Sequence, residues 1–187
     1  MSESHSALDQ DELLHLAIEA TRRGEHGAAI SYLKEGIVRF PKDGKLAYVL
    51  GAEFAQIGMY DKAEEEMARA IELDPSLFTA SFQLGLLRMT LGKVDEAKLA
   101  WSALDTLADE NPLRLFKNGL ELLAAEQYQE ARSLLEQGIA LNTFSPELNR
   151  DMQNVISAIP AADVDQSQGI TAGQAWLTAY GDSDKAD

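Results

Sequence analysis

The side chains best suited to acid–base or metal chemistry near neutral pH are three histidines, His5, His15 and His26. His5 lies in a polar N-terminal segment, His15 on an expected helix and His26 at an expected turn between two helices. A metal site needs several ligands at a spacing that brings them together, and these three do not have such a spacing. The sequence also has no cysteine, which removes thiolate ligands and disulfides. We therefore expect three ordinary exposed histidines and no metal site.

A second candidate for chemistry is the segment from Gly85 to Lys93, which loosely resembles a phosphate-binding loop. Its second glycine, Gly92, follows the first by seven positions where the motif requires five, and no serine or threonine follows Lys93. The acids Asp109 and Glu110 lie at an expected boundary between helical units, where capping and solvation explain them better than catalysis. Since no nucleophile has a candidate base, the sequence predicts no catalytic residue, no cofactor and no enzyme activity.

The dominant pattern in the sequence is a recurrence of small residues every 34 positions. Two series share this interval, and their members are Ala17, Gly51, Gly85 and Gly119, and then Ala29, Ala63, Ala97 and Ala131. Paired helices whose axes lie about 8–10 Å apart need a small residue where they cross. The repeat therefore predicts four helical hairpins, each of which buries the apolar face of its neighbour.

The second repeat carries a family resemblance. Its residues are Ala47-x2-Leu50-Gly51-x2-Phe54, then Ala63, Met67, Ala70 and Pro75. This pattern resembles the tetratricopeptide repeat (TPR) family over residues 10–145, although Asn118 replaces the leucine before the small residue in the fourth repeat. The resemblance implies an all-α, right-handed α-solenoid of four TPR-like helical hairpins plus a C-terminal capping helix. The expected boundaries are 1–9 for a flexible N-terminus, 10–43, 44–77, 78–111 and 112–145 for the repeats, and 146–159 for the capping helix.

Local signals predict where helices end and begin. Gly24, Gly58 and Gly92 are expected to end the first helix of the first three hairpins in the left-handed conformation, which costs glycine little. Ser145 is expected to cap the last helix and Pro146 to lie in its first turn. The apolar stripe of that helix consists of Leu148, Met152, Val155, Ile156 and Ile159. Such a stripe is typical of a terminal helix that covers the end of a repeat stack.

The TPR resemblance implies that the first helix of each hairpin lines a concave groove. The groove residues predicted in this way are Leu14, Ile18, Tyr48, Ala52, Phe82, Leu86, Met89, Phe116, Leu120 and Leu123, with Lys45 and Lys117 placed to fix the ends of a ligand. This apolar lining favours an apolar or amphipathic peptide over the terminal carboxylates that some TPR domains bind with lysine and asparagine. The alternative is that Tyr48, Phe82 and Phe116 pack against one another as core residues.

Residues 160–187 are expected to form a flexible tail with a short apolar segment at 170–180, which contains Trp176, Leu177 and Tyr180. Three interpretations of this segment stay open: a frayed helix against the capping helix, a ligand of the chain's own groove, or a motif that docks on another chain. The free energy gained by burying its large side chains does not exceed the cost of ordering it, so any docking is expected to be easily displaced.

The formal net charge of −15 over 187 residues limits the classes of partner. An acidic surface repels nucleic-acid phosphates and anionic membranes, so we expect a protein or peptide partner. The N-terminal segment lacks the basic and apolar parts of a secretory leader and no apolar run reaches membrane-spanning length, so we expect a cytoplasmic protein. Three functions remain open: an adaptor that binds a peptide in its groove, a dedicated chaperone for a secreted or assembly-prone client, and a scaffold that self-assembles into a homo-oligomer through its tail.

Overall fold

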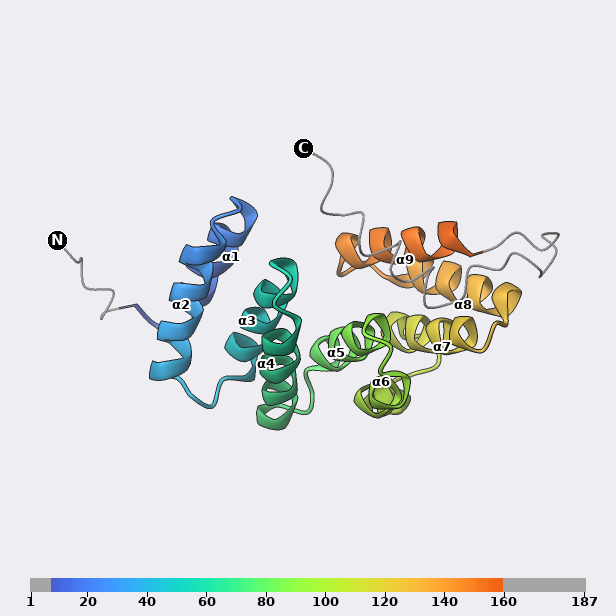
Figure 1. The fold of residues 1–187 in the computed structure, drawn as a ribbon, viewed down its shortest axis with the longest axis horizontal. Coiled ribbons are helices and arrows are strands. Elements are labelled where there is room, and N and C mark those ends of the chain that lie inside the picture. The colour runs from blue at the N-terminus through green and yellow to red at the C-terminus, as the bar shows by residue number, and fades with distance from the viewer. Residues whose placement is uncertain (1–7, 160–187) are drawn as a thin grey trace. The chain divides into compact units, whose positions relative to one another are not determined.

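The structure is a computed structural model, and it describes residues 8–159 (Figure 1). Its elements are α1 (Gln10–Arg22), α2 (His26–Arg39), α3 (Gly44–Gln56), α4 (Tyr60–Leu73), α5 (Phe78–Thr90), α6 (Val94–Trp101), the 3-10 helix η2 (Ser102–Thr106), α7 (Pro112–Ala124), α8 (Tyr128–Leu141) and α9 (Pro146–Ala158). The described residues contain no strand, which confirms the all-α prediction. The predictions for residues 1–7 and 160–187, including Trp176, Leu177 and Tyr180, lie outside this range.

The chain divides into two compact units, one that ends at Leu84 and one that begins at Gly85. The first contains α1 to α4 and the beginning of α5, and the second contains the rest of α5 and all later helices. The right-handed sense of the superhelix stays a prediction.

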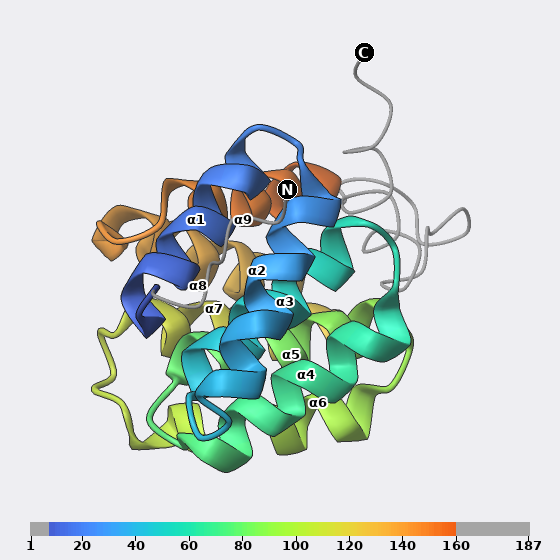
Figure 2. The ribbon, with the colours of Figure 1, turned by 90° about the vertical axis from the view of Figure 1, so that its left-hand side faces the viewer.

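The first unit consists of two helical hairpins, α1–α2 and α3–α4, with α2 packed on α3 (Figure 2). The pairing of α3 with α4 depends on Gly51, because a Cβ added there would lie 2.7 Å from Cγ of Met67 and 3.1 Å from the carbonyl oxygen of Ala63. The contact between α2 and α3 depends on Gly36, where an added Cβ would lie 3.0 Å from a methyl group of Leu46. Small residues therefore serve both the hairpins and the stacking of one hairpin on the next.

The second unit repeats this construction with α7 and α8, and α9 packs on α8. Gly119 of α7 faces Leu135, whose side chain would lie 2.9 Å from an added Cβ. In α5, Gly85 leaves room for the indole ring of Trp101 from α6, which is fully buried. A side chain at Gly85 would overlap that ring. The third repeat therefore requires glycine at this position because the facing residue is a tryptophan.

The second helix of the third repeat departs from the expected regular hairpin. It is α-helical only over Val94–Trp101 and continues as the 3-10 helix Ser102–Thr106. At the position that holds Gly36, Ala70 and Gly138 in the other repeats, this one has Leu104. Trp101, the last residue of α6, and Leu104, in the 3-10 helix, are both fully buried.

The turns inside the hairpins confirm the predicted glycine signals. Gly24, Gly58 and Gly92 have φ angles of 72°, 74° and 76°. The corresponding position of the fourth repeat is Glu126, which has φ of 61° although it carries a side chain. A left-handed conformation at a non-glycine residue costs about 1–2 kcal/mol. The fourth turn therefore retains the geometry of the others at an energetic cost.

Polar side chains cap the first turns of several helices. Asp9 and Glu12 form a reciprocal capping box at the start of α1. Asn111 accepts a hydrogen bond from the backbone N–H of Leu113, and Ser145 accepts one from Leu148 at 3.2 Å. The predicted stripe of α9 is buried along its whole length, which confirms the prediction of an amphipathic last helix.

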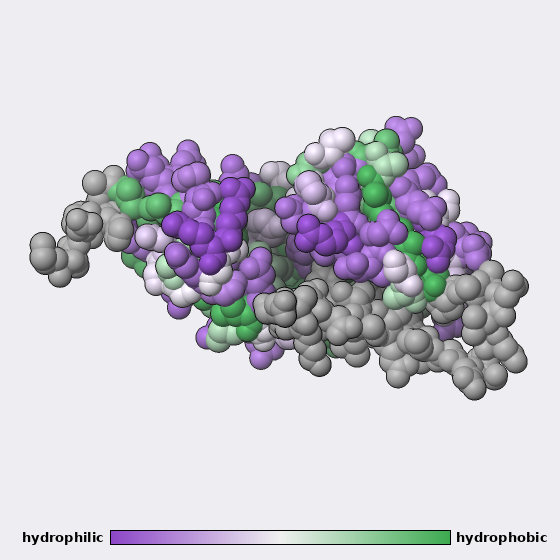
Figure 3. All heavy atoms as spheres, turned by 90° about the horizontal axis from the view of Figure 1, so that it is seen from above, coloured by the Kyte–Doolittle hydropathy of each residue, from purple (hydrophilic) through white to green (hydrophobic). Residues whose placement is uncertain are grey.

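The face of the molecule drawn in Figure 3 is mostly hydrophilic, with hydrophobic residues limited to stretches between hydrophilic ones. Val38 on α2 is the most exposed of the large apolar side chains, at 80%, and has no other exposed large apolar residue near it in sequence. An isolated exposed apolar residue of this kind is ordinary on a protein surface and requires no partner.

The close approach of α3 and α4 predicts that Gly51→Ala destabilises the protein. We expect the free energy of unfolding to fall by about 1–2 kcal/mol, because overpacking outweighs the better helix propensity of alanine. Urea unfolding followed by circular dichroism measures this. Gly27→Ala in α2 is the matched control, since an added Cβ there meets no atom within 4 Å, and it should be neutral or stabilising by up to about 1 kcal/mol. Equal effects at both positions would contradict the requirement for a small residue at Gly51.

The left-handed turn of the fourth repeat predicts that Glu126→Gly stabilises the protein by about 1 kcal/mol, because glycine adopts a positive φ without strain. Thermal unfolding of the variant and the wild type measures the difference. The neighbouring change Ala125→Gly is the control, because Ala125 has φ of −90° and should lose stability when its chain becomes more flexible. A loss of stability in both variants would show that the turn at Glu126 is not strained.

Candidate functional site

The predicted groove residues of the first unit lie on α1 and α3 and are half-buried. They are Leu14 and Ile18 on α1, and Tyr48 and Ala52 on α3, and each pair is separated by one helical turn. Other residues of α1, Leu13, Ala17 and Ala20, are fully buried. The first unit therefore keeps an apolar strip on α1 and α3 that packing within the hairpins leaves partly accessible. We call these four residues the α1/α3 strip.

Tyr48 is the largest side chain of the α1/α3 strip. Its ring packs against a buried cluster of alanines, Ala47, Ala70 and Ala80, from three successive helices. This burial raises the pKa of the Tyr48 phenol; like any tyrosine hydroxyl at neutral pH it is protonated and able to donate a hydrogen bond.

A buried carboxylate connects α1, α2 and α3 beside the strip. Glu53 is only 2% exposed, and its Oε2 accepts a hydrogen bond of 2.7 Å from the hydroxyl of Thr21. Its Oε1 lies 2.5 Å from Nδ1 of His26. A buried carboxylate is costly unless such partners satisfy it, so these two contacts fix the stacking of the first hairpin on the second.

Sequence reasoning missed Glu53, and its expectation of an ordinary exposed histidine is wrong for His26, because the imidazole contacts this buried acid. The signal available in the sequence was a single acid within the apolar stretch Leu50–Ala55. Its two partners are 27 and 32 positions away along the chain, and only the folded structure identifies them.

The remaining predicted groove residues, on α5 and α7, are buried in the structure. They are Phe82, Leu86, Met89, Phe116, Leu120 and Leu123, and none is more than 6% exposed. Phe116 lies against Gly138 of α8, where an added Cβ would meet its ring at 2.5 Å. Phe116 therefore belongs to the interior of the last hairpin, as the alternative core interpretation expects of an aromatic residue at this position.

The two predicted lysines have different surroundings. Lys117 is 7% exposed, and its ammonium lies 2.7 Å from Asp105 and 3.2 Å from Glu121. Burial lowers the pKa of Lys117, but the two carboxylates outweigh that effect and the pKa lies above its ordinary value. Lys117 thus ties η2 to α7, whereas Lys45 is exposed.

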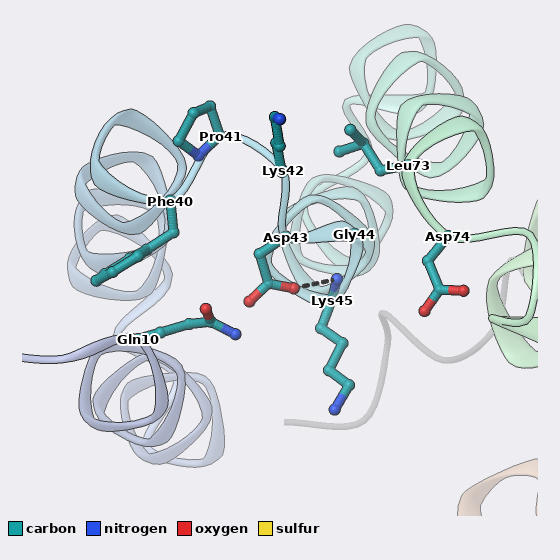
Figure 4. A pocket seen from close by; sticks show the side chains of 9 residues that line it. All are labelled: Gln10, Phe40, Pro41, Lys42, Asp43, Gly44, Lys45, Leu73 and Asp74. Atoms are coloured by element: carbon teal, nitrogen blue, oxygen red, sulfur yellow. Dashed lines mark hydrogen bonds between the residues drawn. The ribbon is translucent and has the colours of Figure 1, made fainter.

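Lys45 lies at the edge of an open pocket in the first unit (Figure 4). The pocket is wide open to solvent, has a volume of about 600 Å³ and is formed where the helix ends of α1, α2, α3 and α4 meet. Its lining residues are Gln10, Phe40, Pro41, Lys42, Asp43, Gly44, Lys45, Leu73 and Asp74. We call this site the helix-end pocket; apart from Lys45, sequence reasoning did not identify its residues as a site.

Among residues 8–159, no group of three or more histidine, aspartate or glutamate side chains is placed to hold a metal ion. None of the helices in the same range combines the length and the apolar character needed to cross a bilayer.

Comparison with known families gives a match to the tetratricopeptide repeat over residues 14–78 and 48–112. Among curated proteins, the chain is 28% identical over 155 residues to small glutamine-rich tetratricopeptide repeat-containing protein 2 of Saccharomyces cerevisiae, which covers 83% of this chain. It is 25% identical over 114 residues, or 61% of this chain, to the BBSome complex member BBS4 of Bos taurus. The chain spans 40% and 22% of the lengths of these two relatives.

Solved structures with a similar fold include MamA, from residue 41 to its end, of Desulfovibrio magneticus RS-1. The TM-score is 0.61 at 18% identity, over 95% of this chain and 97% of that one. YrrB, described as a TPR protein with an unusual peptide-binding site, matches with a TM-score of 0.57 at 15% identity, over 94% of this chain and 87% of that one. These similarities show a shared helical-repeat fold.

The Glu53 contacts predict that Thr21→Val destabilises the protein by about 1–3 kcal/mol, because the isosteric change removes one donor from a buried carboxylate. Chemical unfolding of the two proteins measures the difference. Ser31→Ala is the control, because that exposed hydroxyl bonds only to the backbone of its own helix and its loss should cost less than about 0.5 kcal/mol. In the double variant Thr21→Val with Glu53→Leu, the effect of the Thr21 change should largely disappear. If the destabilisation in the double variant equals the sum of those in the two single variants, the two side chains do not interact.

Proposed function

The chain belongs to the tetratricopeptide repeat family, and we propose that it is a non-enzymatic adaptor that holds an apolar or amphipathic segment of a partner protein against its first two hairpins. The observation that carries the proposal is the α1/α3 strip, which hairpin packing leaves half-buried. The contact region is thereby limited to the unit that ends at Leu84, because the groove residues on α7 are buried. A partner that covers the strip would remove more apolar surface from water, which favours binding.

The comparisons support a protein or peptide as the partner class. YrrB is described as having a peptide-binding site, and BBS4 is named as a member of a complex. Repeat folds of this kind bind partners on extended surfaces rather than in enclosed catalytic pockets. In this chain the α1/α3 strip carries aliphatic and aromatic side chains, which suit an apolar peptide.

The chemistry of the strip specifies the bound segment more closely. Leu14, Ile18 and Ala52 offer aliphatic surface without hydrogen-bonding groups, so specificity along them depends on shape. The Tyr48 hydroxyl is the polar group of the strip, and it can donate a hydrogen bond to a backbone carbonyl of the peptide. Lys45, one turn before Tyr48 on α3, supplies an exposed positive charge at one end of the strip.

The adaptor proposal predicts that Ile18→Glu abolishes partner capture, because a charge in the strip would be desolvated by the bound apolar segment. Affinity capture from an extract of the source cells, followed by mass spectrometry, measures which proteins are lost. Val38→Glu is the matched control, since it makes the same kind of change at an exposed position of α2 and should leave capture intact.

Circular dichroism must show equal helicity in the two variants and the wild type. The proposal fails if a partner is retained by Ile18→Glu at the wild-type level, or if it is lost to the same degree in Val38→Glu.

A further inference from the structure

The helix-end pocket adjoins the α1/α3 strip at Lys45 and offers a second recognition site. We infer that it binds a basic side chain of the partner, arginine in preference to lysine, next to an apolar residue. This inference rests on the proposed adaptor function, because it specifies the sequence of the segment that the adaptor would bind.

The arrangement of the charged side chains carries the inference. In Figure 4 the carboxylates of Asp43 and Asp74 extend to the same side of the pocket, with the side chain of Lys45 between them. Gln10 points from α1 toward Asp43, whereas Lys42 is directed to the opposite side. The side of the pocket with the two carboxylates thus contains a single ammonium group, that of Lys45.

The two carboxylates differ in how accessible they are to a ligand. Asp74 accepts hydrogen bonds from the hydroxyl of Ser76 at 2.6 Å and from its backbone N–H at 2.9 Å, both on Oδ1. These bonds, with a smaller contribution from the charge of Lys45, lower the pKa of Asp74, so it remains ionised well into the acidic range. Asp43 uses Oδ1 to cap α3 through the N–H of Lys45, and its Oδ2 is buried, without a hydrogen-bond partner among residues 8–159, so Asp74 is the carboxylate that a ligand reaches directly.

The lining as a whole holds two carboxylates, Asp43 and Asp74, and two ammonium groups, Lys42 and Lys45. The guanidinium of Arg39 lies over the ring of Phe40, 5.4 Å from its centroid. The preference for a cation is therefore local to the side of the pocket that holds the two carboxylates.

The remaining lining residues determine which kind of side chain binds next to the basic one. Phe40, Pro41 and Leu73 supply apolar surface on the other walls. An arginine suits this combination better than a lysine, because guanidinium is more weakly hydrated and donates to a carboxylate in a fixed bidentate geometry. The ligand class is thus a peptide segment in which an apolar residue adjoins arginine.

The test uses two capped dipeptides, N-acetyl-Leu-Arg-amide and N-acetyl-Leu-Glu-amide, titrated into the ¹⁵N-labelled full chain. We expect the arginine peptide to shift the amide signals of Gly44 and Lys45 saturably at millimolar concentration, and the glutamate peptide to bind at least five-fold more weakly. Equal or tighter binding of the glutamate peptide would overturn the inference.

Charge variants locate the effect. Asp74→Asn should weaken binding of the arginine peptide about three- to ten-fold. Glu72→Gln removes an equal charge outside the pocket lining and should change the affinity for the arginine peptide less than two-fold. Lys45→Ala should tighten binding about two-fold, a gain that misfolding cannot produce. Unchanged affinity in Asp74→Asn, or weaker binding in Lys45→Ala, would also overturn the inference. The dipeptides report on the pocket alone, so their failure is distinguishable from a failure of the Ile18→Glu capture experiment.

Discussion

The fold depends on how closely the two helices of each hairpin approach one another. Gly51 meets Met67, Gly85 meets the indole of Trp101 and Gly119 meets Leu135, in each case at a distance that leaves no room for a side chain. This approach brings the apolar faces into contact and removes them from water, which is the main source of stability in the repeats. Because the small residue recurs every 34 positions, the same local constraint builds both units.

The same constraint determines which surfaces remain for binding. Leu14, Ile18, Tyr48 and Ala52 stay half-buried after the hairpins have packed, although Tyr48 also packs against Ala70 of α4 and Ala80 of α5. The contact of Thr21 and His26 with Glu53 fixes the two hairpins against each other and thus holds α1 and α3 in one arrangement. The helix-end pocket arises from the same stacking, since its walls are the ends of helices from both hairpins.

Much of the fold could be predicted because its signals are local in sequence. The glycine turns, the Ser145 cap and the stripe of α9 each depend on residues within a few positions of one another. The interruption of α6 and the Glu53 contacts could not be predicted, because they depend on how Trp101, Leu104 and Glu53 meet residues of other helices. The accessibility of the groove was beyond sequence reasoning for the same reason: equivalent positions are half-buried on α3 and buried on α7.

Binding through the α1/α3 strip requires that the stacked hairpins present α1 and α3 to a partner. Hydrogen–deuterium exchange of the full chain, alone and bound to a partner that it captures, measures which helices the partner covers. We expect slower amide exchange in α1 and α3 on binding, with little change in α2 and α4. Protection confined to α2 and α4, with α1 and α3 unchanged, would contradict binding through the strip.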